Sequence, residues 1–400
     1  MVSVRPFIGQ HIRPDFVRRV PAPAFDSMSG PERTAYLATH PESYTLVTRS
    51  PGDGGPNDGA STQELIDMGG AALQRIVESG AFEEIDHPAL FLYRLGVDDH
   101  SQIGIVSLVA VQDYLDGHVK RHEQVNVGRA GHLSRHFEQL GAQSSPIALG
   151  YRSDPEIRSL LDAVLARTEP VVEFTSGDGL EQAVWVIDDE QDATAICAAF
   201  ASHDLYIMDG HHRAAAAGQL LERQQEAQWM LGVLFADDRV NIEPFHRRAT
   251  IAPDADLDQR HAALIETLSL VEDETPATEL PEWPGGIGVW MDGRWWSGTL
   301  PDPVSDSPLD SIDPVRLQTS VLGPILGIDP SMPAGRIDYF LDQKDRRVLA
   351  AEADERDLLF VLRPVSPAEV FAVADAGLDM PPKSTYVFPK PRSGVFLRRF

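Results

Sequence analysis

The stretch that decides the fold of this 400-residue chain is DLYIMDGHHRAAAAGQLL, residues 204–221. An apolar run over residues 205–208 stops at Asp209 and Gly210, and an alanine-rich segment follows at once. The apolar run is typical of a buried strand, and residues 211–221 have the composition of a helix. Glycine supplies the backbone freedom that a tight turn between them needs. The stretch therefore predicts a strand, a glycine turn and a helix.

The start of this helix carries chemistry suited to an anion. The first turn of a helix presents unpaired N–H groups and the positive end of its dipole. Arg213 adds a planar guanidinium that matches phosphate oxygens, and the alanines allow close packing of the helix on a sheet. We therefore predict that Gly210, His211, His212 and Arg213 bind a phosphate group.

Two alternatives for this stretch remain open at the level of sequence. Asp209 can simply cap the helix, with the histidines as polar surface residues. A metal site is the second alternative, although adjacent helical residues point about 100° apart. His211 and His212 could then share one ion only with a ligand from elsewhere, for instance His122. No HExxH or similar spacing supports that alternative.

A second polar stretch, VKRHEQVNVGRAGHLSRH, covers residues 119–136. Glu123 offers a base for a hydroxyl group or a ligand for Mg²⁺. A solvated loop or a helix face with ion pairs explains the same pattern equally well. The cationic or potentially cationic side chains suit an anionic substrate, and they are Lys120, Arg121, His122, Arg129, His132, Arg135 and His136.

The bulk composition excludes several classes of partner. The chain has 61 acidic and 34 basic residues and a net charge of -27, so its surface repels nucleic acid. Cys197 is the single cysteine, which excludes an intrachain disulfide and a cysteine-rich metal site. Without a signal peptide or a long apolar run, we expect a soluble, cytoplasmic protein with no membrane partner. The oligomeric state stays open.

Strand and helix patterns alternate around the motif, which predicts a mixed α/β (α+β) fold. Residues 62–82 predict a helix that ends at Gly80, and residues 89–97 and 101–111 predict two paired strands. Residues 51–60 predict a flexible loop, and the tryptophan-rich residues 283–298 a packed hairpin. The character of the chain changes near residue 252. We therefore expect a core at 1–251 and a C-terminal α/β region at 252–400 packed on it.

Taken together, DGHHRAAAA at residues 209–217 and VKRHE at residues 119–123 resemble the DUF1015 family. The resemblance runs from VRPFIGQHIRP at residues 4–14 to MPPKSTYVFPKPRSGVF at residues 380–396. That family is similar to the ParB/sulfiredoxin-like superfamily, in which a glycine turn and an arginine at a helix start hold nucleotide phosphates. Free-serine kinases belong to the same superfamily. The resemblance implies a ParB-like nucleotide-binding core with additional N- and C-terminal α/β elements.

The resemblance also implies roles for individual residues. Gly210, His211, His212 and Arg213 hold the phosphates of ATP or ADP. Asp209 lies against Mg²⁺ or the transferred group. Glu123 orients the acceptor hydroxyl and binds Mg²⁺. His122 and Lys120 lie around the phosphates. The acceptor pocket is lined by Asp26, Ser43, Arg135 and His136.

The sequence departs from the family pattern after Glu123. A threonine and an arginine, a Lys-Glu pair and an Asp-Arg pair are expected there, whereas this chain has Val125, Asn126, Arg129, Ala130, His132 and Leu133. Our primary hypothesis is a Mg²⁺-dependent kinase that transfers a phosphoryl group from ATP or ADP to the hydroxyl of serine or a related amino acid. The alternatives are a nucleotide sensor that has lost catalysis and a biosynthetic tailoring enzyme that acts on a modified amino acid.

Overall fold

The computed structural model describes residues 1–24, 27–48, 59–97, 100–225, 227–329, 335–342 and 344–400. The chain forms two compact units, Met1–Asn241 with Pro389–Phe400, and Ile242–Phe388. The second unit is thus inserted before the tail, whereas the sequence grouped the whole of 252–400 as one region. Most of the predicted loop at 51–60 lies outside the described residues.

The first unit is built on a nine-stranded sheet with the order β6-β11-β8-β12-β5-β4-β10-β9, with β1 paired to β5. Most neighbours are antiparallel, but β11 runs parallel to β6 and β12 runs parallel to β8. The strands of this sheet are β1 (Val4–Arg5), β4 (Leu90–Val97), β5 (His100–Ala110), β6 (Val119–Lys120), β8 (Ile147–Tyr151), β9 (Val172–Thr175), β10 (Glu181–Ile187), β11 (Leu205–Asp209) and β12 (Trp229–Ala236).

Seven helices and a small second sheet complete the first unit as described. The small sheet has the order β3-β2-β21-β7 and joins the N-terminal segment to the tail. Its strands are β2 (Gln10–Ile12), β3 (Phe82–Glu84), β7 (Ala142–Gln143) and β21 (Phe396–Arg399). The helices are α1 (Gly30–Thr39), α2 (Thr62–Glu78), α3 (Val111–Leu115), α4 (Val127–Leu140), α5 (Pro155–Leu165), α6 (Glu190–Ala199) and α7 (His211–Arg223).

Side-chain alternation along the strands explains the two buried faces of the large sheet. On β4, Leu90 and Leu92 join a core shared with α5, α6 and α7. The intervening Phe91 points to the other face, where its ring lies 5.5 Å from those of Phe7 and Phe396. A period of two places successive residues on opposite faces, so both faces of this strand are covered.

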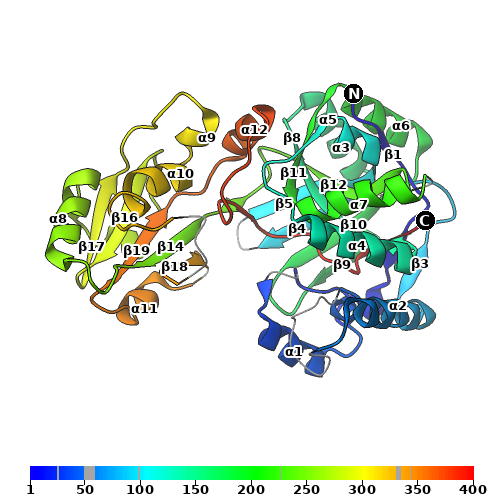
Figure 1. Cartoon of the computed structure of the whole chain (residues 1–400). Helices are drawn as coiled ribbons and strands as arrows, with labels where there is room; N and C mark the ends of the chain where they lie inside the picture. The colour runs from blue at the N-terminus through cyan, green and yellow to red at the C-terminus, as the bar shows by residue number, and fades with distance from the viewer. Residues whose placement is uncertain (25–26, 49–58, 98–99, 226, 330–334, 343) are drawn as a thin grey trace. The chain divides into compact units, whose positions relative to one another are not determined.

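Helix α7 is placed by its alanines. Ala214 and Ala217 pack into the core of the large sheet, whereas Ala216 and Leu220 pack against Phe137 of α4. Figure 1 shows α4 and α7 side by side over the strands. Small side chains on two faces let this helix approach both neighbours closely, which fixes the position of its first turn.

The second unit has a six-stranded antiparallel sheet with the order β15-β17-β16-β19-β14-β18. The predicted tryptophan hairpin is confirmed, because Trp290 pairs with Trp295 across β16 and β17 and both are buried. Its elements are β13 (Ile242–Glu243), β14 (Phe245–Thr250), α8 (Leu257–Leu268), β15 (Val271–Glu272), β16 (Gly286–Met291), β17 (Arg294–Thr299), α9 (Pro308–Ser311), α10 (Asp313–Leu317), β18 (Ile337–Leu341), α11 (Arg346–Ala351), β19 (Asp357–Leu362), α12 (Pro367–Asp375) and β20 (Tyr386–Val387).

Several predicted elements are confirmed in the first unit. Helix α2 ends at Glu78 with Gly80 in the left-handed region, at a φ of 77°. Strands β4 and β5 pair as expected, and the mixed α/β class holds. The basic stretch folds largely as α4, which Asn126 caps and the left-handed Gly141 ends. No helix in the described part of the chain is long and apolar enough to cross a membrane.

Candidate functional site

The turn between β11 and α7 depends on Gly210. This residue has a φ of 103°, in the region that favours glycine, and a Cβ there would lie 2.9 Å from Arg213 Nε. Gly210 is also the N-cap residue, and no side chain caps the helix at this end. Asp209 therefore does not cap α7, contrary to the simpler alternative. The first-turn amides are left for another acceptor.

The Asp209 carboxylate lies between two cations. Arg213 pairs with one oxygen and donates a second hydrogen bond to Pro146 O at 2.5 Å. Lys390 Nζ lies 2.8 Å from the other oxygen. Burial alone raises the pKa of Asp209, but Lys390 and Arg213 together hold it well below its ordinary value. Two cations around one carboxylate leave a local positive charge beside the start of α7.

Lys390 was not among the residues predicted for the site. It is one of four lysines and belongs to the proline-rich tail, 181 positions from its partner. The sequence motif YVFPKPRSG contains it, but nothing local indicates that the tail returns to β11. Only the position of Pro389–Phe400 in the first unit brings it there.

The two adjacent histidines point to different partners. The His212 ring is half-buried, and its Nε2 accepts a hydrogen bond from the Asn126 amide at 3.2 Å. Burial, with a contribution from Arg129, lowers its pKa. His211 is 4% exposed and faces His122, so the two histidines do not converge on one point.

His122, Glu123 and His211 form a compact group below the turn. The rings of His122 and His211 meet edge to face, with centroids 4.5 Å apart. Glu123 Oε2 lies 3.5 Å from His211 Nδ1, and the His122 amide donates to His211 Nε2 at 3.4 Å. Burial lowers the pKa of His122 to about 4, and burial, with a contribution from His122, holds the pKa of His211 well below its ordinary value. Both rings are neutral at neutral pH.

The remaining predicted residues are spread over the unit. Lys120 pairs with Asp204 at 2.6 Å, before the start of β11 rather than after its end. Arg135 is exposed on α4. Ser43 is buried, and its hydroxyl accepts from the Thr45 amide at 3.3 Å. Asp26 lies outside the described residues. The assignments of these residues stay predictions.

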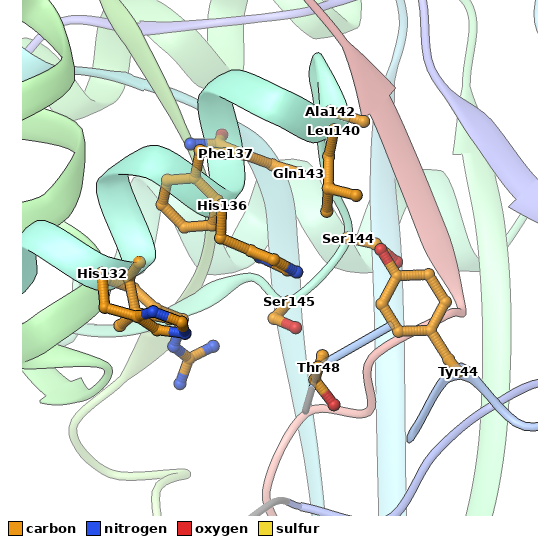
Figure 2. A pocket seen from close by; sticks show the side chains of 12 residues that line it. Tyr44, Thr48, His132, His136, Phe137, Leu140, Ala142, Gln143, Ser144 and Ser145 are labelled. Atoms are coloured by element: carbon orange, nitrogen blue, oxygen red, sulfur yellow. The ribbon is translucent and has the colours of Figure 1, made fainter. Parts of the chain in front are cut away.

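A small cavity of about 50 Å³ adjoins Arg213. Figure 2 shows His136 of α4 and Tyr44 of the 3₁₀ turn Tyr44–Leu46 projecting into it from opposite sides. The lining surface is mostly apolar and includes a few hydroxyl, imidazole and amide groups; the other residues that form it are Thr48, His132, Leu133, Phe137, Leu140, Ala142, Gln143, Ser144 and Ser145. The cavity therefore combines hydrogen-bonding groups with the arginine of the turn.

A larger cavity of about 820 Å³ lies in the same unit, between α1 and the β9–β10 hairpin. The stacked rings of Tyr36 and His40 line it, with centroids 4.0 Å apart. The ion pair of Asp178 with Arg392 lines it as well. The tail thus places Lys390 at the turn and Arg392 at this second cavity.

The first unit is a mixed α/β domain whose most distinctive site is a glycine turn from strand to helix, flanked by two cations. The chain belongs to the family described as "Protein of unknown function (DUF1015)", whose model matches residues 4–319. The resemblance seen in the sequence is thereby confirmed. No curated protein matches the chain.

Three solved structures are similar to this chain over most of its length. A free serine kinase in complex with AMP is 15% identical, covers 72% of this chain and 91% of its own, and has a TM-score of 0.35. SbnI from Staphylococcus aureus, with a C-terminal truncation, is 11% identical over 72% and 85%, with a TM-score of 0.37. A conserved hypothetical protein from Pyrococcus furiosus is 15% identical over 71% and 91%, with a TM-score of 0.33. None of these assigns an activity to this chain.

Proposed function

We propose that this protein binds a nucleotide with its phosphates at the start of α7 and transfers a phosphoryl group to the hydroxyl of serine or a related amino acid. The observation that carries the proposal is the turn itself. Gly210 leaves the first-turn amides of α7 without a side-chain cap, and Arg213 and Lys390 add positive charge beside them. Uncapped amides, a helix dipole and cations together favour a phosphate.

The role of Asp209 in this proposal is to hold the two cations in place. A carboxylate between Arg213 and Lys390 fixes their positions without cancelling both charges. Phosphoryl transfer depends mainly on positioning and charge stabilisation, so preorganised cations are an effective contribution. Whether Asp209 also approaches a metal ion stays a prediction.

The small cavity beside Arg213 is the proposed acceptor site. Its few hydroxyl, imidazole and amide groups can bind the hydroxyl, amino and carboxylate groups of a compact substrate, and its volume of about 50 Å³ disfavours a large one. In the reaction, the bond from the terminal phosphorus to the bridging nucleotide oxygen breaks and a bond to the acceptor oxygen forms. The hydroxyl proton passes to the carboxylate of Glu123, which is 36% exposed in its side chain.

Magnesium would enter this reaction bound to the nucleotide. Mg²⁺ in such sites is held by phosphate oxygens, water and one or two carboxylates. Glu123 is the carboxylate at the first turn of α7 that fits this role, since Asp209 is engaged by two cations. When bound, the ion would neutralise charge on the transferred group.

The test is a direct assay for the phosphorylated product. Wild-type protein is incubated with L-serine and either MgATP or MgADP, and phosphoserine is measured by ³¹P NMR and mass spectrometry. We expect Arg213→Ala to reduce turnover by about 100-fold or more, because it removes a cation aimed at the developing charge. Arg75→Ala, which removes an exposed arginine from α2, is the matched control and keeps wild-type turnover.

Circular dichroism and thermal unfolding check that both variants are folded. Equal turnover of wild type and Arg213→Ala would overturn the site. Nucleotide binding by calorimetry without phosphoserine, on any nucleotide and small hydroxyl amino acid tried, would support the sensing protein instead. The engagement of Asp209 by two cations is compatible with that second function, since it needs binding alone.

A further inference from the structure

We propose that His122, Glu123 and His211 bind a first-row transition metal ion, such as Mn²⁺, Co²⁺ or Zn²⁺. One ligand atom from each residue lies within 4.8 Å of the other two. The inference goes beyond the proposed phosphoryl transfer and is tested without nucleotide.

The first argument is the burial of His122. Its side chain is 1% exposed, and neither ring nitrogen has a hydrogen-bond partner among the described residues. A buried polar group without a partner costs about 1–3 kcal/mol, and native structures usually avoid this. A bound cation would supply the missing partner for one nitrogen. If the ring served only to fill space in the core, an apolar side chain would do so without the cost of unsatisfied nitrogens.

The second argument is the spacing within the group. The contact of Glu123 Oε2 with His211 Nδ1 is 3.5 Å, and that of the His122 amide with His211 Nε2 is 3.4 Å. Both are long for hydrogen bonds, which centre on about 2.9 Å. Ligand atoms that share one ion at bonds of about 2.1 Å lie about 3.4 Å apart in a tetrahedral site. The 3.5 Å between Glu123 Oε2 and His211 Nδ1 is therefore closer to the spacing of two ligands on one ion than to that of a hydrogen-bonded pair.

The donor set determines which ion the site prefers. Two imidazoles and one carboxylate suit Mn²⁺, Co²⁺, Zn²⁺ and similar ions, whereas Mg²⁺ prefers oxygen ligands. Glu123 supplies the carboxylate of this donor set, and its Oε2 lies next to His211 Nδ1. Since His211 is the first residue of α7, the ion would also bring positive charge close to the turn.

Metal binding has one structural requirement. An ion on His211 Nδ1 places the ring proton on Nε2, so the long contact with the His122 amide must open. Because that contact is already long, little hydrogen-bond energy is lost when it opens. Open coordination positions beyond these three ligands would be filled by water or a substrate oxygen.

The experiment uses the full chain after removal of metal with a chelator. Co²⁺ is titrated while its visible absorption spectrum reports the ligands, and Mn²⁺, Zn²⁺ and Mg²⁺ are compared by calorimetry. We expect one Co²⁺ per chain and at least tenfold weaker binding of Mg²⁺. His122→Leu and Glu123→Gln each weaken Co²⁺ binding by about 100-fold. His212→Ala, a change at the adjacent histidine, leaves it unchanged.

Thermal unfolding provides a readout that separates ligand loss from misfolding. In metal-free protein, His122→Leu is at least as stable as wild type, because it removes an unsatisfied buried group. Added Co²⁺ raises the unfolding temperature of wild type and not of the variant. Absence of Co²⁺ binding at millimolar concentration, or equal binding by wild type and His122→Leu, would overturn the proposal. Neither result depends on whether the protein phosphorylates serine.

Discussion

At the scale of single residues, the turn that opens α7 rests on one glycine. The φ of Gly210 is 103°, and its missing Cβ leaves room for the Arg213 side chain to fold back over the turn. Arg213 can then reach both Asp209 and Pro146. Gly210 therefore allows the left-handed backbone conformation and also leaves space for the Arg213 side chain.

This dual role predicts the effect of Gly210→Ala. The left-handed backbone alone costs about 1–2 kcal/mol for a residue with a Cβ. Because the new methyl group would also displace Arg213, nucleotide affinity should fall by about tenfold or more. Urea unfolding and calorimetry with nucleotide measure the two effects.

Gly80→Ala is the matched control for this prediction. Gly80 has a φ of 77°, but a Cβ there meets nothing within 4 Å. We expect a similar loss of stability and no change in nucleotide affinity. If Gly210→Ala bound nucleotide as tightly as Gly80→Ala, the turn would not be the phosphate site.

At the scale of elements, α4 connects the turn to the N-terminal segment. It packs along α7, and its His136 donates a hydrogen bond from Nε2 to Val47 O at 2.7 Å. Burial lowers the pKa of His136 to about 4, although the bond to Val47 opposes the shift. A neutral imidazole thus holds the wall of the small cavity.

The pKa of His136 predicts a loss of stability in mild acid. The folded pKa is depressed, so the unfolded state takes up the proton first as the pH falls below 6.5. The contribution is fully present above pH 6.5 and is lost as the pH falls towards 4. By about pH 5 the free energy of unfolding should have dropped by about 2 kcal/mol from this group.

Urea unfolding of wild type and His136→Gln at neutral pH and at about pH 5 tests this. Glutamine can still donate to Val47 O but does not titrate. Between neutral pH and about pH 5, the free energy of unfolding should therefore fall by about 2 kcal/mol less in the variant than in wild type. The same loss in both proteins would show that His136 is accessible to protons in the folded state. A leucine variant would be less informative, because it also removes the hydrogen bond.

At the scale of the whole molecule, the sequence predicted individual helices and strands better than it predicted how they assemble into sheets and units. The periodicity of apolar residues is local, so β11, α7, α2 and the pair β4–β5 follow from it directly. The order of the strands in the large sheet does not follow from chain order, and the return of the tail to the first unit depends on contacts across the whole chain.

The candidate site likewise contains residues that local sequence predicts and residues that only the folded chain brings together. Gly210 and Arg213 were predicted from a motif because a turn and a helix start are local features. Lys390 was missed because it meets Asp209 only in three dimensions. The meeting of His122 with His211 was raised only as an alternative, since it requires β6 and β11 to be parallel neighbours. The net charge of -27 conceals these local cations.

The most direct test of the phosphate site is a crystal structure of the full chain soaked with a magnesium nucleotide. The account predicts the terminal phosphates within hydrogen-bond distance of the amides at residues 210–212, with Arg213 and Lys390 on either side. Phosphates bound elsewhere in the molecule, with the turn at Gly210 covered by side chains or without ligand, would contradict it.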